Sequence, residues 1–566
     1  MANARPGQGL IAHWPFADDC EEQVGGLVTR NRGVELSGSG PRGESGAAVF
    51  SGDGAFLEAE DHPALHVGSG EFTVAAWVRA AADNGDVVGD LVSKFDPDTR
   101  RGLQLSIVTN SGVTSTAQSN YRNLHFGIDA GMDPEWTDRG RPGNAVFVTA
   151  LTVAQGKLYA GTLETGADEM GRLWRYGDDG TWLDLGNPVG CNVVHTVAEF
   201  DGGLYAGFGR YIGQSSDLDE TRNTTPGGQV YGLEPDGRWV YCGHPGAEDA
   251  TPEEAQTAGF ANHVHAKTPD EVASTGFSTG KADDVLALTT YQGRLYCTSN
   301  HRRGAFVYQG GEDWRYIGPD HRLLSFTVYR GRLYTLVNGG MVYRYEGGAE
   351  WSYCGRPEGS IQTYSAATHA GRLYVGTWPE GQVHRYEGGE AWVGVGSEGR
   401  VGFEREIMGM ALYNGKVYLG SLPMANVWRM DGDQFTFVGN LDTTPTTLRR
   451  VWSMAVYRGE LFAGTLPSGR VYSAAAGQLA SWDQAFPDGW HQVTAVRDRT
   501  GLRLYVDGKQ VATSPPPGTR AFDLSNDSPL RIGFGPHDCF RGRISDLRLY
   551  GRSLDTPEIE RLATNG

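Results

Sequence analysis

The chain has 566 residues, 82 of them glycine, and a formal net charge of −19 at pH 7. Its length predicts more than one domain. The negative balance argues against nucleic acid or an anionic membrane surface as the partner, and no apolar run approaches the about 18 residues of a transmembrane helix.

The first residues, Met-Ala-Asn-Ala-Arg-Pro-Gly, lack the apolar core of a signal peptide. We therefore expect either a cytoplasmic protein or a secreted or periplasmic protein whose leader has been removed. The six cysteines show no CxxC spacing. We expect free thiols, with a Cys20–Cys539 disulfide as the alternative if the two chain ends lie together.

The two ends of the chain share one pattern. Residues 1–132 alternate apolar and polar positions in short runs separated by Gly, Asp and Asn, and residues 476–566 resume the same alternation. Period-two runs of this kind predict antiparallel strands whose apolar faces pack as a sandwich. We predict one β-sandwich built from both ends, with the strand at 11–16 near the strand at 544–550.

Four phrases in these ends carry a family resemblance. They are Phe72-Thr-Val-Ala-Ala-Trp-Val, Gly489-Trp-His-Gln-Val, Leu504-Tyr-Val-Asp-Gly and Gly542-Arg-Ile-Ser-Asp-Leu-Arg-Leu-Tyr. Together they resemble the laminin-G-like, concanavalin A-type jelly roll. The resemblance implies carbohydrate binding and a structural Ca²⁺ held by Asp53 and Asp546. The alternative is that both are turn or edge residues, because Ca²⁺ takes about six to eight oxygen ligands.

Between the two ends, a motif of the type Leu-Tyr-Ala-Gly-Thr recurs seven times. The copies begin at Leu158, Leu204, Leu295, Leu333, Leu373, Val417 and Leu461. Five of the six spacings are 38 to 46 residues, and the sixth is 91. A repeat of about 40 residues made of short strands is typical of a β-propeller blade. We predict a seven-bladed β-propeller over residues 133–475, inserted into the sandwich, with an insertion at 244–282 after the second blade.

Each blade pattern contains an x-Gly turn and ends in a fourth strand with an aromatic residue. The aromatic residue is absent after the seventh copy but present before the first, at Trp136. The phrase Glu135-Trp-Thr-Asp-Arg-Gly-Arg-Pro-Gly closely matches Glu350-Trp-Ser-Tyr-Cys-Gly-Arg-Pro-Glu-Gly. We predict that Trp136 lies in the outer strand of the last blade, which closes the ring and removes an exposed strand edge.

In the seven repeats, the residue nine positions before each motif varies, whereas the residue eight positions before it is always small. Nine residues before each motif stand Thr149, His195, Leu286, Leu324, Tyr364, Met408 and Trp452. We interpret this column of residues as the lining of a pocket near one end of the central channel of the propeller. Packing between blades is the alternative, which we favour for Leu286, Leu324 and Met408.

The irregular loops at the same end of the ring add polar side chains. Loops are where functional residues gather on a rigid scaffold. The candidates for catalysis are His195, Arg210, Tyr211, His263, His301, Tyr364 and Arg405. The candidates for substrate binding are Arg302, Trp378, Arg449 and Trp452.

Three functions compete for this end of the ring. The first is a polysaccharide lyase that cleaves a uronate-containing glycan by β-elimination and needs no cofactor for catalysis. Tyr364 or Tyr211 would abstract the proton with its pKa lowered by guanidinium groups, His195 or His263 would assist, and Arg210 and Arg405 would hold the carboxylate. The architecture is similar to that of propeller polysaccharide lyases, although none of their motifs is present.

The second function is a glycoside hydrolase with Glu164 and Glu380 as its carboxylate pair. Sialidases combine propellers with such jelly rolls, but their repeated Ser-x-Asp-x-Gly-x-Thr-Trp motif is absent here. The third is a non-catalytic module that binds a glycan or a protein. Fold alone does not decide among these three.

Overall fold

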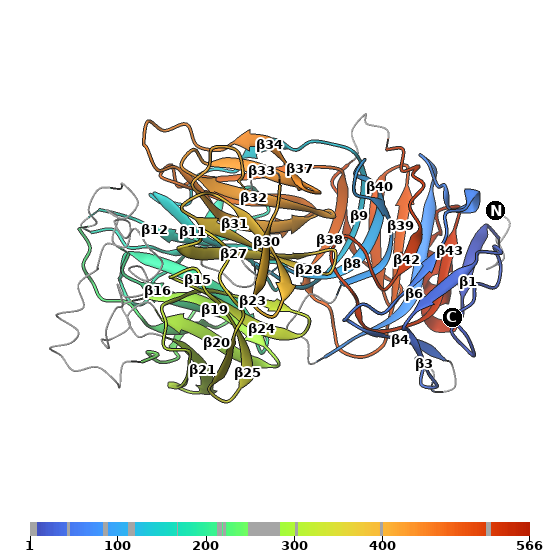
Figure 1. Cartoon of the computed structure of the whole chain (residues 1–566), viewed down its shortest axis with the longest axis horizontal. Helices are drawn as coiled ribbons and strands as arrows, with labels where there is room; N and C mark the ends of the chain where they lie inside the picture. Colours follow the sequence, from blue (N-terminus) through green and yellow to red (C-terminus); the bar gives the residue numbers. More distant parts are fainter. Residues whose placement is uncertain are drawn as a thin grey trace.

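The computed structural model describes residues 8–41, 43, 46–82, 89–110, 119–166, 168–211, 218, 222–246, 284–299, 304–396, 400–516 and 522–565. Within these residues it is almost entirely β-structure, in two bodies that lie side by side (Figure 1). One body is a propeller and the other is a sandwich that holds both chain ends. None of the described helices is long and apolar enough to span a membrane.

The first sheet of the sandwich combines strands from both ends of the chain. Its order is β3 (Glu35–Ser37), β4 (Ala47–Ser51), β43 (Arg541–Tyr550), β6 (Phe72–Ala80), β39 (His491–Asp498), β40 (Gly501–Val506) and β41 (Lys509–Thr513), with β1 (Leu10–Trp14) also paired to β43. The pairing of β1 with β43 confirms the predicted contact between the two chain ends. The helix α3 (Thr556–Asn565) follows β43.

The second sheet of the sandwich faces the first across an apolar core. Its order is β38 (Gln478–Ala485), β9 (Asn120–Ala130), β8 (Arg101–Asn110), β7 (Gly89–Asp96), β42 (Leu530–Ile532), β5 (Phe56–Ala59) and β2 (Thr29–Arg32). A short 3-10 helix, Pro63–Leu65, follows β5. Buried side chains of both sheets, among them Trp14, Phe50, Phe126 and Phe540, fill the core. The alternation seen in the sequence therefore marks the inward faces of the two sheets.

The propeller consists of seven four-stranded blades. Blades one to three are β11 (Phe147–Ala154), β12 (Lys157–Leu163), β13 (Leu173–Tyr176), β14 (Trp182–Gly186); β15 (Val193–Phe200), β16 (Gly203–Gly209), β17 (Val230–Leu233), β18 (Trp239–Tyr241); and β19 (Val285–Tyr291), β20 (Arg294–Ser299), β21 (Ala305–Gly310), β22 (Asp313–Gly318). Blades four and five are β23 (Leu323–Tyr329), β24 (Arg332–Val337), β25 (Val342–Gly347), β26 (Glu350–Tyr353); and β27 (Gln362–His369), β28 (Arg372–Trp378), β29 (Val383–Gly388), β30 (Ala391–Gly394). Blades six and seven are β31 (Glu406–Tyr413), β32 (Lys416–Leu422), β33 (Asn426–Asp431), β34 (Gln434–Asn440); and β35 (Arg450–Tyr457), β36 (Glu460–Leu466), β37 (Val471–Ala475), β10 (Glu135–Asp138).

The seventh blade closes the ring as the sequence predicts. Its outer strand β10 comes from the chain before the first blade and pairs with β37, placing Trp136 opposite Ala474. The indole Nε1 of Trp136 donates to the carbonyl oxygen of Val438 in blade six at 3.0 Å. The tryptophans at the same position in blades one to five each donate to the preceding blade in the same way: Trp182, Trp239, Trp314, Trp351 and Trp392. The repeated outer-strand tryptophan therefore links neighbouring blades.

The sandwich covers the end of the propeller where the first and second strands of each blade are joined. The backbone N–H of Ala370 in blade five donates to Pro536 O at 3.0 Å, and that of Gly156 in blade one donates to Asp483 O at 2.8 Å. In blade six, the ammonium group of Lys416 is paired with Asp129 of the sandwich, and both side chains are buried. These contacts hold the sandwich against that end of the propeller at blades one, five and six.

The six cysteines are free thiols in the structure. Cys20 is partly exposed and Cys539 is buried. This agrees with the expectation of free thiols and not with a Cys20–Cys539 disulfide.

Candidate functional site

The variable column of the repeat corresponds to a β-bulge in the innermost strand of every blade. The ladder between first and second strands is interrupted at the column residue, for example at His195 between Val194 and Thr196 and at Met408 between Ile407 and Gly409. The other bulged residues are Thr149, Leu286, Leu324, Tyr364 and Trp452. A bulge adds one unpaired residue and changes the direction of its side chain. In blades two to seven the bulged residue lines a common cavity, whereas Thr149 of blade one instead donates its hydroxyl to Val194 O.

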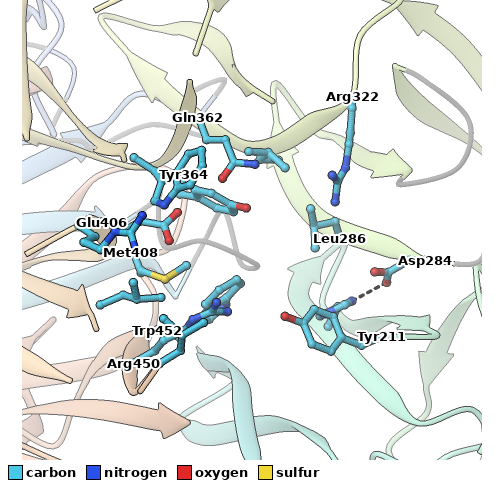
Figure 2. Close-up of a pocket in the computed structure, with 16 residues that line it drawn as sticks. Tyr211, Asp284, Leu286, Arg322, Gln362, Tyr364, Glu406, Met408, Arg450 and Trp452 are labelled. Carbon is cyan, nitrogen blue, oxygen red and sulfur yellow. Dashed lines mark hydrogen bonds and ion pairs between the residues drawn. The ribbon is translucent and has the colours of Figure 1, made fainter. Parts of the chain in front are cut away.

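These side chains surround a cavity of about 120 Å³ to which blades two to seven contribute. It is lined by His195, Tyr211, Asp284, Leu286, Arg322, Leu324, Gln362, Tyr364, Trp378, Arg405, Glu406, Met408, Leu422, Leu448, Arg450 and Trp452. We call it the central pocket. Figure 2 shows Tyr364, Glu406 and Arg450 on one side of it, facing Arg322 and Tyr211 on the other.

A histidine–aspartate pair forms one wall of the central pocket. Nδ1 of His195 lies 2.5 Å from Oδ1 of Asp284, and both side chains are about 1 % exposed (dashed line in Figure 2). Nε2 of His195 is buried and has no hydrogen-bond partner in the described part of the chain. Because a carboxylate accepts hydrogen bonds, the pairing places the proton on Nδ1 and leaves the lone pair on Nε2. The ring of Tyr211 packs edge-on against His195, with 5.6 Å between centroids.

The opposite wall carries two groups whose pKa is raised by burial. Burial raises the pKa of Glu406 to about 7, opposed by the nearby Arg450 and Arg405. Burial also raises the pKa of Tyr364 above its ordinary value, although Arg322 and Arg450 act in the other direction. The expectation that guanidinium groups lower the pKa of Tyr364 is therefore wrong, because desolvation outweighs them. At neutral pH the Tyr364 hydroxyl is a hydrogen-bond donor.

Three guanidinium groups, those of Arg322, Arg405 and Arg450, line the central pocket against two carboxyl groups, those of Asp284 and Glu406. Since Glu406 is partly protonated near neutral pH, the pocket carries an excess of positive charge although the whole chain is strongly acidic. Burial lowers the pKa of Arg322, because desolvation makes its charged form costly. An anionic ligand group would relieve that cost.

The structure brings together six of the candidates from the sequence, namely His195, Tyr211, Tyr364, Arg405, Trp378 and Trp452. Arg210 and Arg449 do not line the central pocket; the guanidinium of Arg449 instead donates to Asp442 O and to Met424 Sδ, each at 3.1 Å. The candidates His263, His301 and Arg302 lie outside the described residues.

The proposed hydrolase pair does not meet in the central pocket. Glu164 belongs to blade one, where it is buried and its pKa is raised to about 7 by desolvation. Glu380 belongs to blade five, where its carboxylate lies 2.8 Å from the guanidinium of Arg400. Neither lines the central pocket, so this pocket does not hold the pair.

The two candidate calcium ligands also lie apart. Ser51 of β4 pairs with Arg541 at the start of β43, which places Asp53 beyond that end. Asp546 lies further along β43 and pairs with His13 at 2.7 Å and Arg548 at 2.8 Å, whereas Asp53 pairs with Arg330 at 3.2 Å. The positions and cationic partners do not fit a shared Ca²⁺.

One other group in the described residues has metal-ligand spacing: Asp61, His66 and Asp527, all with exposed positions. The ammonium of Lys94 already donates to Asp61 at 2.6 Å. That contact places a protein cation on one of the three ligands, so this set also fits Ca²⁺ poorly.

Sequence reasoning missed three polar lining residues that stand two positions before the column. These are Asp284, Arg322 and Gln362; Glu406 and Arg450 occupy the same position in blades six and seven. Residues i and i+2 of a strand share a face, so this second column was visible in the repeat. The partnership of Asp284 with His195 was not, because 89 residues separate them.

Comparison with family models agrees with the sandwich body of the fold. Residues 451–560 match the family model of the concanavalin A-like lectin/glucanases superfamily. The chain carries a concanavalin A-like domain. The match spans strands β38 to β43 and begins within the last blade. No curated protein matches the chain.

Several solved structures resemble the chain across 60% of its length. The structure of streptogramin B lyase has 10% identity and a TM-score of 0.38, with 97% of that chain covered. The WD40 β-propeller domain of Doa1 has 12% identity and a TM-score of 0.38, also with 97% covered. A putative gluconolactonase has 12% identity and a TM-score of 0.31, with 92% covered. Likenesses this weak carry no functional argument.

Proposed function

We propose that the protein is a carbohydrate-active lyase that cleaves an acidic, uronate-containing glycan by β-elimination in the central pocket. The observation that carries this proposal is the buried His195–Asp284 pair, whose free Nε2 lone pair lines a cavity with three guanidinium groups. A base beside a cluster of cations suits removal of a proton α to a carboxylate, because the cations stabilise the charge that develops there.

We assign the steps of the elimination to the pocket residues as follows. Arg322 and Arg450 bind the uronate carboxylate and stabilise the charge that forms on it. Nε2 of His195 takes the C5 proton, the electron pair forms the C4–C5 double bond, and the bond from C4 to the glycosidic oxygen breaks. The protonated Tyr364 hydroxyl gives its proton to that leaving oxygen. Asp284 holds the imidazole in the required tautomer and stabilises the imidazolium.

These roles differ from the sequence-based hypothesis in the arginines that hold the carboxylate and in the roles of Tyr364 and His195. Tyr364 acts as the general acid, because burial raises its pKa and keeps the hydroxyl protonated. A tyrosine base would require the opposite shift. The histidine, which that hypothesis gave an assisting role, becomes the base because its Nε2 has no other partner in the described residues.

The position of the central pocket favours attack at a chain end. The pocket residues Glu406 and Met408 stand at the start of β31, whereas Lys416, which pairs with Asp129 of the sandwich, follows its far end. About 20 Å of strand therefore separates the pocket from the covered end of the ring. The fully buried His195 is out of reach of a glycan chain that lies across the mouth, so a chain end must enter the pocket.

The test is the ultraviolet absorbance of the conjugated alkene that β-elimination leaves on the product. The wild-type chain and the His195→Asn variant are incubated with a panel of uronate polymers, including polygalacturonate, alginate and glucuronate-containing glycans. We expect alkene formation by the wild type on at least one polymer and none by the variant. If new reducing ends appear without the alkene, the reaction is hydrolysis and the proposal is rejected.

Non-catalytic glycan binding is the second candidate. It is favoured by the match of residues 451–560 to the concanavalin A-like lectin/glucanases superfamily. In that case the glycan would bind without any change in its products, and the His195→Asn variant would bind as the wild type does. The same incubation distinguishes the two candidates.

A further inference from the structure

A second cavity, unrelated to the central pocket, lies where the sandwich meets blades four and five. Its volume is about 610 Å³. One wall comes from the β4–β5 turn and the loop before β43, which contribute Asp53 and Phe534. The other comes from strands β24, β25, β28 and β29, on the side of the ring that faces the sandwich (Figure 1). We call this cavity the seam groove; it shares no lining residue with the central pocket.

The seam groove concentrates guanidinium groups. Four arginines line it, Arg330, Arg332, Arg344 and Arg372, against the carboxylates of Asp53 and Glu387. This local excess of cations occurs in a chain whose net charge is −19. A positive groove on an acidic protein attracts anions and rejects neutral or cationic ligands.

The guanidinium groups are available to a ligand because their present ion pairs are exposed. Arg330 lies 3.2 Å from Asp53, with side chains 52% and 64% exposed. Arg372 lies 3.2 Å from Glu387, with side chains 51% and 31% exposed. Exposed pairs of this kind contribute little to stability. A carboxylate ligand can therefore replace the protein carboxylates, and the planar guanidinium group binds carboxylates in a bidentate manner.

Apolar rings lie beside these cations. Phe56 and Phe534 pack together with 5.1 Å between ring centroids, and both are partly exposed at the sandwich wall. Tyr329, Tyr334 and Tyr386 line the propeller wall. Sugar rings present apolar C–H faces between polar groups, so aromatic rings beside guanidinium groups suit an acidic sugar better than a free inorganic anion.

We propose that the seam groove is a binding site for a linear, carboxylate-bearing oligosaccharide. Alternate uronate carboxylates pair with Arg332 and Arg372, while the sugar rings pack against the partly exposed rings of Phe56 and Phe534. The ligand contacts both bodies and so strengthens their junction. The site acts in binding only and stands whether or not the central pocket is catalytic.

The test compares two matched sets of arginine substitutions. Arg332 and Arg372 follow the turn glycine in blades four and five, in the phrase Gly-Arg-Leu-Tyr, and Arg294 occupies the same place in blade three without lining the groove. The double variant Arg332→Ser/Arg372→Ser removes two of the four arginines from the groove. Arg294→Ser is the control, since it removes an exposed arginine from the equivalent turn of blade three. All variants carry His195→Asn to prevent turnover and Arg322→Ser to weaken the central pocket.

Binding of hexagalacturonate is measured by calorimetry, with maltohexaose as the neutral probe and inorganic phosphate as the free anion. We expect the double variant to bind hexagalacturonate at least about tenfold more weakly, because it loses two charge-assisted contacts. We expect the Arg294→Ser control to bind as its parent does. Maltohexaose and phosphate should bind much more weakly than hexagalacturonate.

Three results would overturn the proposal: no binding of hexagalacturonate to the parent protein, equal binding by the double variant, or equal affinity for maltohexaose. Circular dichroism and thermal unfolding establish that the double variant is folded. Its substituted side chains are exposed, so a folded variant that has lost binding reports on the groove itself.

Discussion

Nδ1 of His195 in blade two lies 2.5 Å from Oδ1 of Asp284, which comes 89 residues later and directly precedes blade three. Asp284 also forms a backbone bridge to Gly209 at the end of β16. The pair therefore joins two neighbouring blades at the pocket wall. It forms only when the two blades are assembled, so the proposed base depends on the fold of the ring.

Asp284→Asn should reduce the rate of alkene formation on the order of a thousandfold or more. The carboxamide can donate a hydrogen bond to Nδ1, which moves the imidazole proton to Nε2 and removes the lone pair that acts as base. Substrate binding should remain close to that of the wild type, because Asp284 makes no contact with the carboxylate in the proposed mechanism. The measurement is kcat together with the affinity for uncleaved substrate. A variant that keeps its kcat would reject His195 as the base.

Glu406→Gln should remove a pH dependence of ligand binding. The pKa of Glu406 is about 7, so its carboxyl group is neutral below that pH and charged above it. Binding of an anionic ligand should weaken by about tenfold as the pH rises through 7, since one buried negative charge appears beside it. In the glutamine variant the affinity should stay at its low-pH value. Titrations are made in the His195→Asn background, which excludes the histidine as the source.

The same carboxyl group should affect stability in a defined pH range. Its folded pKa of about 7 lies above the ordinary value of 4.5, so folding favours the neutral form. That contribution is complete below pH about 4.5 and is lost as the pH rises through 7, by about 3 kcal/mol in total. Glu406→Gln should flatten this part of the profile, measured as the free energy of unfolding in urea from pH 4 to 8. An unchanged slope between the two proteins would contradict the shifted pKa.

The ion pair between Lys416 and Asp129 should stabilise the junction of the two bodies, because each buried charge needs the other as its partner. Both side chains are buried, and Asp129 also accepts from the backbone of Met132 at 3.0 Å. Asp129→Ala leaves a buried ammonium without its partner and should cost about 3 to 5 kcal/mol. Glu60→Ala breaks an exposed pair with Arg30 on the sandwich surface and should cost less than about 1 kcal/mol. Equal losses in denaturant unfolding would contradict the role of burial.

The seven blades were predictable because every repeat carries the same local chemistry. The turn before each Leu-Tyr motif has positive φ at two consecutive residues, such as Gln155 (51°) and Gly156 (74°), and such turns join hairpin strands. Trp136 precedes the first blade in the sequence. It could be assigned to the last blade because an aromatic residue stands at the equivalent position in each of the other blades. The lining column was also visible, although its cause, a bulge in each inner strand, was not.

What the sequence did not reveal depends on distances across the ring. Nothing local to Asp284 identifies His195 as its partner, and nothing local to Tyr364 shows that burial outweighs the guanidinium groups around it. The two candidate calcium ligands fail for the same reason, because strand register separates Asp53 from Asp546. The spacing of residues in the sequence predicts which face of a strand a side chain lies on. It does not predict which charged groups of other strands lie next to that side chain.

Trp136→Phe tests the link between the last two blades. The substitution keeps an aromatic ring but removes the Nε1 donor, which now contacts Val438 O at 3.0 Å. Blade six carries Phe435 at the equivalent position, so a phenylalanine ring fits this slot. We therefore expect a loss of about 1 kcal/mol, the contribution of one hydrogen bond, from the free energy of unfolding.

Trp314→Phe is the matched control within the ring, because the indole of Trp314 donates to Cys242 O at 2.7 Å in the same geometry. Both variants lose one donor at a blade junction. However, Trp136 also anchors the strand that closes the propeller, and the pairing of β10 with β37 is made by only four residues on each side. Trp136→Phe should therefore increase amide exchange in β10 and β37, whereas Trp314→Phe should affect only its own blade. If both variants increased amide exchange equally in all blades, closure of the propeller ring would not depend on β10.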